Sequence, residues 1–194
     1  DESDMTNDIY YPADRCARLA IGTDGKPDRY LWSKNISNND FLTLCAGTGD
    51  KEPLLELKVP PKKLATKSDP LCDNLYQLAS EERKLKDVNI TFSLKEGRIC
   101  GFTGERHDMI SFVRSLMVQL TSLYSYDELK IIVVYNEEEK AQWDYARWFP
   151  HVWSNDNTFR YIASKNQDLK ELSVQLEKEV TARTEGEKTD IPHF

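Results

Sequence analysis

The segment RICGFTGERHDMISFVRSLMVQLTSLY, residues 98–124, contains the main evidence for the fold that we expect for this chain. Its beginning predicts a strand over Arg98–Phe102, which follows a tight turn at Glu96-Gly97. Its end predicts a helix over Asp108–Tyr124, because apolar residues recur there at helical spacing. These apolar residues are Val113, Leu116, Met117, Leu120 and Leu123. A glycine-rich turn at 101–108 joins the strand to the helix, and ligands of α/β proteins bind at such turns.

Downstream of this unit, strands and helices continue to alternate. Leu129–Tyr135 is nearly all apolar, as in a strand that is covered on both faces. The later predicted elements are a helix over Glu137–Arg147, a strand over Phe159–Ala163, a helix over Asn166–Arg183 and a strand within 190–194. Such alternation is typical of a parallel sheet with covering helices. We therefore expect residues 41–194 to form an α/β domain with a three-layer core and a mostly parallel sheet, after an N-terminal linker and short helix in residues 1–40.

The region before this unit is predicted to contain a helix and a small β-hairpin. Pro12 opens a short helix that ends near Ile21, because proline is well tolerated in the first turn. Strands over Phe41–Ala46 and Leu54–Val59 flank 47–50, whose glycines suit a hairpin turn. The remaining predicted elements are a helix from Ser68-Asp69-Pro70 to Lys86 and a strand over Val88–Leu94.

Composition restricts the possible functions. The 194 residues carry a net charge of −7, whereas a nucleic-acid-binding surface is normally basic. We interpret the basic cluster of Lys58, Lys62, Lys63 and Lys67 as a solvated loop, so no nucleic-acid partner is expected. The four cysteines form no CxxC pair, so no metal site is expected. No apolar run approaches the ~20 residues of a membrane span, and no signal peptide is visible, which favours the cytosol.

The turn at 101–108 can be compared with the phosphate-binding P-loop pattern GxxxxGK[ST]. Gly101 matches the first glycine, but Arg106 replaces the second glycine, His107 the lysine, and Asp108 the Ser/Thr that holds magnesium. A side chain at the second glycine obstructs the cradle of backbone N–H groups, and a mostly neutral histidine does not replace the lysine charge. We therefore expect neither ATP nor magnesium as a cofactor. The candidate residues of this degenerate phosphate loop are Gly101, Thr103, Gly104, Arg106, His107 and Asp108.

Aromatic residues are dense between positions 143 and 153. Trp143, Trp148 and Trp153 are candidates for a protein interface, since tryptophan is enriched in interaction hot spots. Packing of the same rings between helix and sheet is the alternative interpretation. His151 is a candidate general base, although a hydrogen-bonded structural role is favoured because no nucleophile with a supporting acid is apparent nearby.

Together these motifs resemble the FtsK/SpoIIIE superfamily of membrane-anchored motor ATPases. The segment 101–104 stands where those motors have GTTGSGKS, and Pro150-His151 stands where they have a Pro-His after the next helix. Within the superfamily, the chain is most similar to the membrane ATPase of type VII secretion, the EssC/YukB/EccC type. The features shared with its first cytoplasmic, degenerate ATPase-like domain (the DUF or D0 domain) are Tyr11-Pro12 with Cys16, Leu31-Trp32, Gly47-Thr48-Gly49, Gly104-Glu105-Arg106 and the aromatic run from Trp143 to Trp153.

The resemblance implies a RecA/FtsK-type, P-loop NTPase-like core that has lost its catalytic residues, with the Walker B residues beyond Phe194. It implies a role in assembly, regulation and protein export, between the membrane segment and the active motor domains of the parent ATPase. The implied location is the cytoplasmic side of the bacterial cell membrane. The implied partners are the adjacent ATPase domains, other membrane components of type VII secretion and, in the parent, further copies in a homo-hexamer.

Two alternatives remain open at this point. One is a divergent P-loop domain that binds and hydrolyses ATP through Arg106. The other is a fragment of a DNA-translocating FtsK/SpoIIIE motor, which the acidic net charge disfavours.

Overall fold

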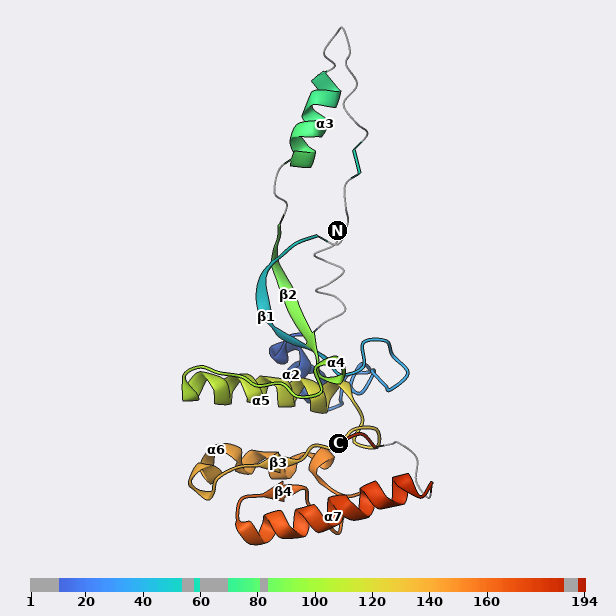
Figure 1. The fold of residues 1–194 in the computed structure, drawn as a ribbon, viewed down its shortest axis with the longest axis vertical. Coiled ribbons are helices and arrows are strands. Elements are labelled where there is room, and N and C mark those ends of the chain that lie inside the picture. The colour runs from blue at the N-terminus through green and yellow to red at the C-terminus, as the bar shows by residue number, and fades with distance from the viewer. Residues whose placement is uncertain (1–10, 54–57, 60–69, 81–83, 187–191) are drawn as a thin grey trace.

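The structure is a computed structural model, and it describes residues 11–53, 58–59, 70–80, 84–186 and 192–194. Helices and strands are mixed along the chain, which confirms the α/β class (Figure 1). The longer elements are α2 (Ala13–Ile21), β1 (Thr43–Lys51), α3 (Pro70–Ser80), β2 (Leu85–Ser93), α5 (Arg106–Leu123) and α7 (Asn166–Thr184). The shorter elements are α4 (Leu94–Gly97), β3 (Val133–Val134), η1 (Glu137–Glu139), α6 (Lys140–Trp143), η2 (Asp144–Trp148), η3 (Pro150–Val152) and β4 (Ile162–Ala163).

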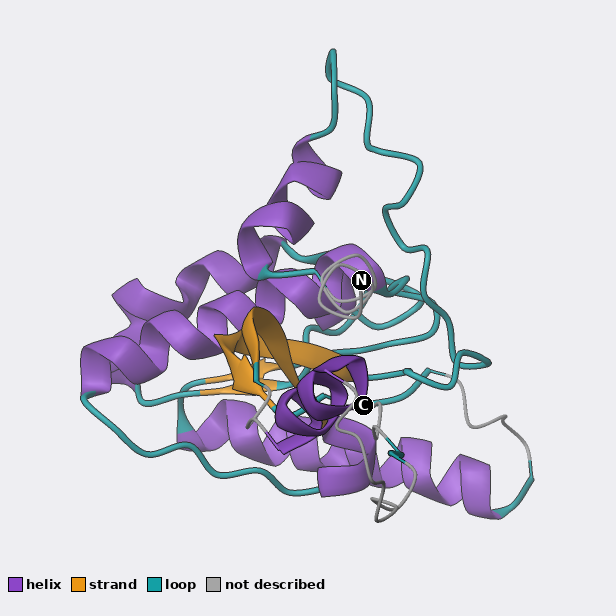
Figure 2. Cartoon of the chain, turned by 90° about the horizontal axis from the view of Figure 1, so that it is seen from above, coloured by secondary structure: helices purple, strands orange, loops and turns teal. Residues whose placement is uncertain are grey.

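The described strands form two small sheets rather than one. β1 and β2 pair antiparallel, and β3 and β4 pair parallel. In Figure 1, α5 lies between them, with α2 and the β1–β2 pair on one side and β3, β4 and α7 on the other. Figure 2 shows the strands in the middle of the molecule with helices around them. The predicted parallel pairing is therefore found at β3–β4, whereas a complete three-layer P-loop core is not formed by the described residues.

The helix α5 connects two hydrophobic cores. On one side, Leu116 and Leu123 pack with the buried residues of α2 and of the β1 region, which are Cys16, Leu19, Phe41 and Leu44. On the other side, Ile110 and Met117 pack with a cluster that contains Val133 and Trp143. The predicted apolar stripe is thus confirmed, and it is wide enough to serve both cores.

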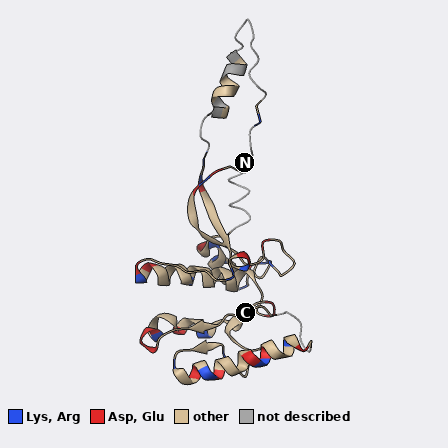
Figure 3. Ribbon diagram, in the orientation of Figure 1, with Lys and Arg blue, Asp and Glu red and all other residues tan. Residues whose placement is uncertain are grey.

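Two other predicted helices are also confirmed within one or two residues. α2 begins after Pro12, which has an extended backbone at the N-cap. α7 buries Leu172, while acidic and basic residues follow one another along its outer face (Figure 3). A stripe of apolar residues and a solvated charged face explain why the sequence predicts these helices.

The predicted hairpin turn at 47–50 is wrong. β1 continues through these residues, and Thr48 pairs with Asn89 of β2. A register shift just before Gly47 marks a bulge, and Gly47 has a φ of 154°, which a residue with a Cβ adopts rarely. The glycines therefore allow a bulge within a strand instead of a turn. The second predicted hairpin strand, 54–59, lies mostly outside the described residues.

The predicted strand over Arg98–Phe102 is also wrong. β2 ends at Ser93, whose Oγ accepts a hydrogen bond from the N–H of Glu96 at 3.2 Å and so caps the one-turn helix α4. The chain leaves α4 through Arg98 at a φ of 52°, a left-handed conformation that interrupts an extended strand. Ile99 is then 93% exposed. Local capping at Ser93 therefore overrides the strand propensity of the residues that follow.

Three further predicted elements are shorter than expected. The helix predicted to run to Lys86 ends at Ser80, and its predicted N-terminal signal at 68–69 lies outside the described residues. The helix predicted over Glu137–Arg147 is divided among η1, α6 and η2. Only Val133–Val134 of the long predicted strand is regular, because its backbone N–H groups bond to different segments: Lys130 to His193, Ile131 to His151 and Val133 to Tyr161. The predicted last strand is seen as a parallel bridge between Leu129 and His193.

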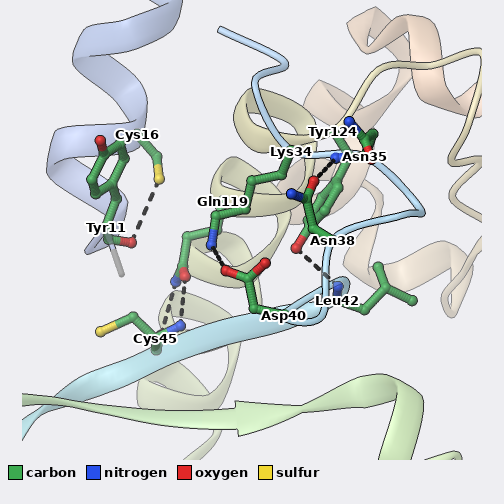
Figure 4. A network of polar contacts seen from close by, with 10 residues as sticks. All are labelled: Tyr11, Cys16, Lys34, Asn35, Asn38, Asp40, Leu42, Cys45, Gln119 and Tyr124. Carbon is green, nitrogen blue, oxygen red and sulfur yellow. Dashed lines mark hydrogen bonds and ion pairs between the residues drawn. The ribbon is translucent and has the colours of Figure 1, made fainter. Parts of the chain in front are cut away.

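Buried polar side chains hold β1 onto α5 (Figure 4). The Gln119 amide accepts a hydrogen bond from the Cys45 N–H at 2.7 Å and donates one to the Cys45 carbonyl at 2.8 Å. The Tyr124 hydroxyl accepts a hydrogen bond from the Leu42 N–H at 2.9 Å. Both side chains are almost completely buried, so these bonds satisfy backbone groups that water does not reach.

Candidate functional site

The candidate phosphate loop lies at the exposed N-terminal end of α5. All of residues 101–108 are exposed, and the helix begins at Arg106, two residues earlier than predicted. Its N-cap, Glu105, makes no side-chain hydrogen bond to the helix. Arg106, His107 and Asp108 therefore form the first turn, where the partial positive charge of the helix already faces the Asp108 carboxylate.

A phosphate cradle strictly requires glycine, whereas the two glycine positions of this loop do not. A Cβ added to Gly101 would have no atom within 4 Å, and its φ lies outside the left-handed region. A Cβ added to Gly104 would lie 2.9 Å from the Met109 Cε, which is the far end of a flexible side chain. The backbone of this turn therefore does not depend on glycine at either position.

The Arg106 guanidinium is held by a carboxylate of the same chain. Its Nε donates a hydrogen bond to the Glu139 Oε1 at 2.9 Å, and its Nη2 donates to both oxygens of that carboxylate. The indole N–H of Trp143 donates a further bond to the Glu139 Oε2 at 3.2 Å. The bond from Arg106 lowers the pKa of the Glu139 carboxyl and raises that of the Arg106 guanidinium, so the pair stays ionised.

The three tryptophans fall in different environments. Trp143 is buried in the core beneath α5, and Trp153 packs against the same cluster with Arg160 4.0 Å above its ring centroid. Trp148 is 80% exposed, and only this tryptophan of the three has a largely open ring. The structure therefore separates them: packing explains Trp143 and most of Trp153, and Trp148 remains a candidate for contact with a partner.

His151 lies in the interior and cannot reach a substrate in solution. Its side chain is 0% exposed, and its Nε2 is 2.8 Å from the Tyr124 carbonyl oxygen, so Nε2 must carry the proton. Burial lowers its pKa, and the nearby Lys130 charge lowers it further. A general base at this position is therefore excluded, and His151 is a structural residue that ties η3 to the end of α5.

No group of three His, Cys, Asp or Glu side chains lies close enough to hold a metal ion in the part of the chain that the structure describes. A groove between α2 and the β1–β2 pair is lined by residues such as Tyr11, Arg15 and Thr48, but by none of the predicted site residues. Of the described helices, none combines the length and the apolar character that a bilayer crossing requires.

The sequence does not reveal the partner of Arg106. Glu139 lies near the start of the helix predicted over Glu137–Arg147, 33 residues from Arg106. Such a pair leaves no local spacing pattern, because ion pairs along one helix show up only at three or four residues.

Comparison with known proteins finds relatives in type VII secretion. The chain is 25% identical over 171 residues to the ESX secretion system protein YukB of Bacillus subtilis, with 84% of the chain and 11% of the relative covered. It is 22% identical over 169 residues to the ESX secretion system protein EccC of Geobacillus thermodenitrificans, with the same coverage. The Type VII secretion system protein EssC of Staphylococcus aureus is 25% identical over 122 residues, which cover 63% of the chain and 8% of the relative. No family model matches the chain.

The predicted relationship to type VII secretion proteins is confirmed. The chain is a homologue of EssC/EccC-type secretion proteins and spans about a tenth of the length of these relatives.

Proposed function

We propose that this homologue of the EssC/EccC-type proteins is a non-catalytic, ATPase-like domain that serves assembly and regulation in type VII protein export. In this proposal, the parent protein is an ATPase of the FtsK/SpoIIIE type. The domain links the membrane segment to the active motor domains on the cytoplasmic side of the membrane. Its partners are those motor domains, other membrane components of the system and, in a hexameric parent, neighbouring copies of the same chain.

The pairing of Arg106 with Glu139 carries this proposal. Arg106 is the only arginine or lysine of the loop. A nucleotide phosphate would have to displace a carboxylate that already accepts hydrogen bonds from the guanidinium. Glu105 and Asp108 add negative charge at the same helix end, so the loop repels a polyanion more than it attracts one.

The proposal can be tested by ATP turnover and by export. We expect no magnesium-dependent turnover by the purified chain. In cells that carry the full-length parent, replacement of 104–106 by alanines should reduce export while the chain stays folded and its response to nucleotide stays absent. Normal export after deletion of the whole domain would contradict a role in assembly or regulation.

A divergent ATP-binding domain is the second candidate, because the Arg106 side chain is still 64% exposed. That function predicts turnover that is lost on Arg106→Ala. A DNA-translocating fragment predicts DNA affinity that falls steeply with salt, and the net charge of −7 argues against it.

A further inference from the structure

The Glu139 carboxylate bonds both to the loop and to the segment that follows β3. It accepts hydrogen bonds from Arg106 at the start of α5 and from Trp143 in α6. Its side chain is 23% exposed, whereas the neighbouring Glu138 is exposed to solvent. Of these two adjacent carboxylates, only Glu139 therefore points at the loop.

A second contact fastens the same segment to α5. The Arg114 Nη2 donates a hydrogen bond to the Gln142 carbonyl oxygen at 2.6 Å. Arg106 and Arg114 are eight residues apart, which places them about 12 Å apart along one face of the helix. Since Arg114 and the burial of Trp143 also hold the segment, it does not depend on Arg106 alone for its position.

The Arg106–Glu139 contact matches the geometry by which arginine binds phosphate. Carboxylate and phosphate both present two oxygens to the planar guanidinium, and each accepts a pair of parallel N–H bonds. The Glu139 carboxylate thus occupies the N–H groups of the Arg106 guanidinium to which an anion from solution would bind. The Arg106 side chain is 64% exposed, so salt screens the pair and an anion from solution can reach the guanidinium.

We propose that Glu139 is a built-in inhibitor of the loop, a carboxylate that occupies Arg106 and keeps polyphosphate anions from binding there. The inference rests on the proposed function, because it takes the domain to be non-catalytic and explains how the loop is kept from binding anions. In this inference, Arg106 binds one of two partners at a time. It binds Glu139 in the unmodified chain, and an anion of the polyphosphate class when the Glu139 carboxylate is removed.

The experiment is a calorimetric titration of the whole chain with inorganic triphosphate at low ionic strength, with and without Glu139→Gln. Glutamine removes the charge and keeps an oxygen that accepts the Trp143 N–H bond, so the fold is preserved, as circular dichroism would verify. We expect Glu139→Gln to bind triphosphate at least ~10-fold more tightly, because one repulsive charge near the anion is lost and one attractive charge is freed. Arg106→Ala in the Glu139→Gln background should abolish this gain.

Glu138→Gln is the matched control, because it removes the same charge from an exposed neighbour that does not bond to Arg106. Equal gains in Glu138→Gln and Glu139→Gln, or no gain in Glu139→Gln, would overturn the inference. Those outcomes concern only the ratio of triphosphate affinities between the variants. The proposed function fails on a different result, magnesium-dependent ATP turnover by the unmodified chain.

Discussion

The two ends of α5 are stabilised in different ways. At the C-terminal end, the buried side chains of Gln119 and Tyr124 bond to backbone groups of Cys45 and Leu42, and the buried His151 side chain bonds to the Tyr124 carbonyl oxygen. At the N-terminal end, every residue of the loop is exposed, and Arg106 is joined to Glu139 by a contact that solvent reaches. Buried, satisfied polar groups contribute more to stability than exposed ion pairs. The contacts that stabilise the fold are therefore concentrated at the C-terminal end of α5. At the N-terminal end, the contact between Arg106 and Glu139 can be broken without unfolding the chain.

The largest effect that this comparison predicts is on stability after Gln119→Leu. Leucine leaves the N–H and the carbonyl of Cys45 buried without their partner. We expect a loss of about 2–4 kcal/mol in the free energy of unfolding, because each buried group left unsatisfied costs ~1–3 kcal/mol. Urea denaturation measures it.

The control for this substitution is Gln142→Leu, which makes the same chemical change at an exposed side chain. Its effect should stay within ~0.5 kcal/mol. Equal losses in the two variants would show that the buried amide is not what holds β1 to α5.

A smaller loss is expected from Tyr124→Phe. The ring and its edge-on contact with Phe41 remain, while the acceptor for the Leu42 N–H is removed. The expected cost is about 1 kcal/mol. Tyr126→Phe, which keeps the ring against His151, should cost less, and a reversed order would contradict the role assigned to the Tyr124 hydroxyl.

The buried imidazole predicts a dependence of stability on pH. Burial lowers the pKa of His151 below 6.5, so the unfolded chain takes up a proton that the folded chain refuses. Stability should therefore fall as the pH drops below about 6.5, down to the folded pKa. His151→Gln, which keeps an N–H donor near the Tyr124 carbonyl, should flatten this slope. Exposed His107→Gln should leave it unchanged, and equal slopes in all three proteins would contradict the assignment.

The smallest effect is predicted at the loop end. Gly101→Ala should change the free energy of unfolding by less than ~0.5 kcal/mol, because its Cβ meets open space at an ordinary φ. Gly47→Ala is the matched comparison, since a φ of 154° should make alanine cost about 1 kcal/mol there. Thermal unfolding of both variants measures the difference. A severe loss at Gly101 would mean that the turn needs its glycine after all.

The helices α2, α5 and α7 could be predicted from the sequence, whereas the candidate site could be predicted only in part. Apolar residues recur at helical spacing in α5 and α7, which is the primary sequence signal of a helix. The strand expected at 98–102 was lost to a serine cap at Ser93, and the glycines at 47–50 permit a bulge as readily as a turn. The contacts of Gln119 and Arg106 join residues 74 and 33 positions apart, and nothing in the local pattern marks them.

The most direct test of the closed loop is a titration of the unmodified chain with Mg-ATP, followed by heat of binding and by the midpoint of unfolding. A site with a Kd of ~10 μM would stabilise the fold by ~2.7 kcal/mol at ~1 mM ATP. We predict no heat and no shift of the midpoint. A magnesium-dependent heat that is matched by a higher midpoint would contradict the account, since it would mean that the loop binds nucleotide despite Glu139.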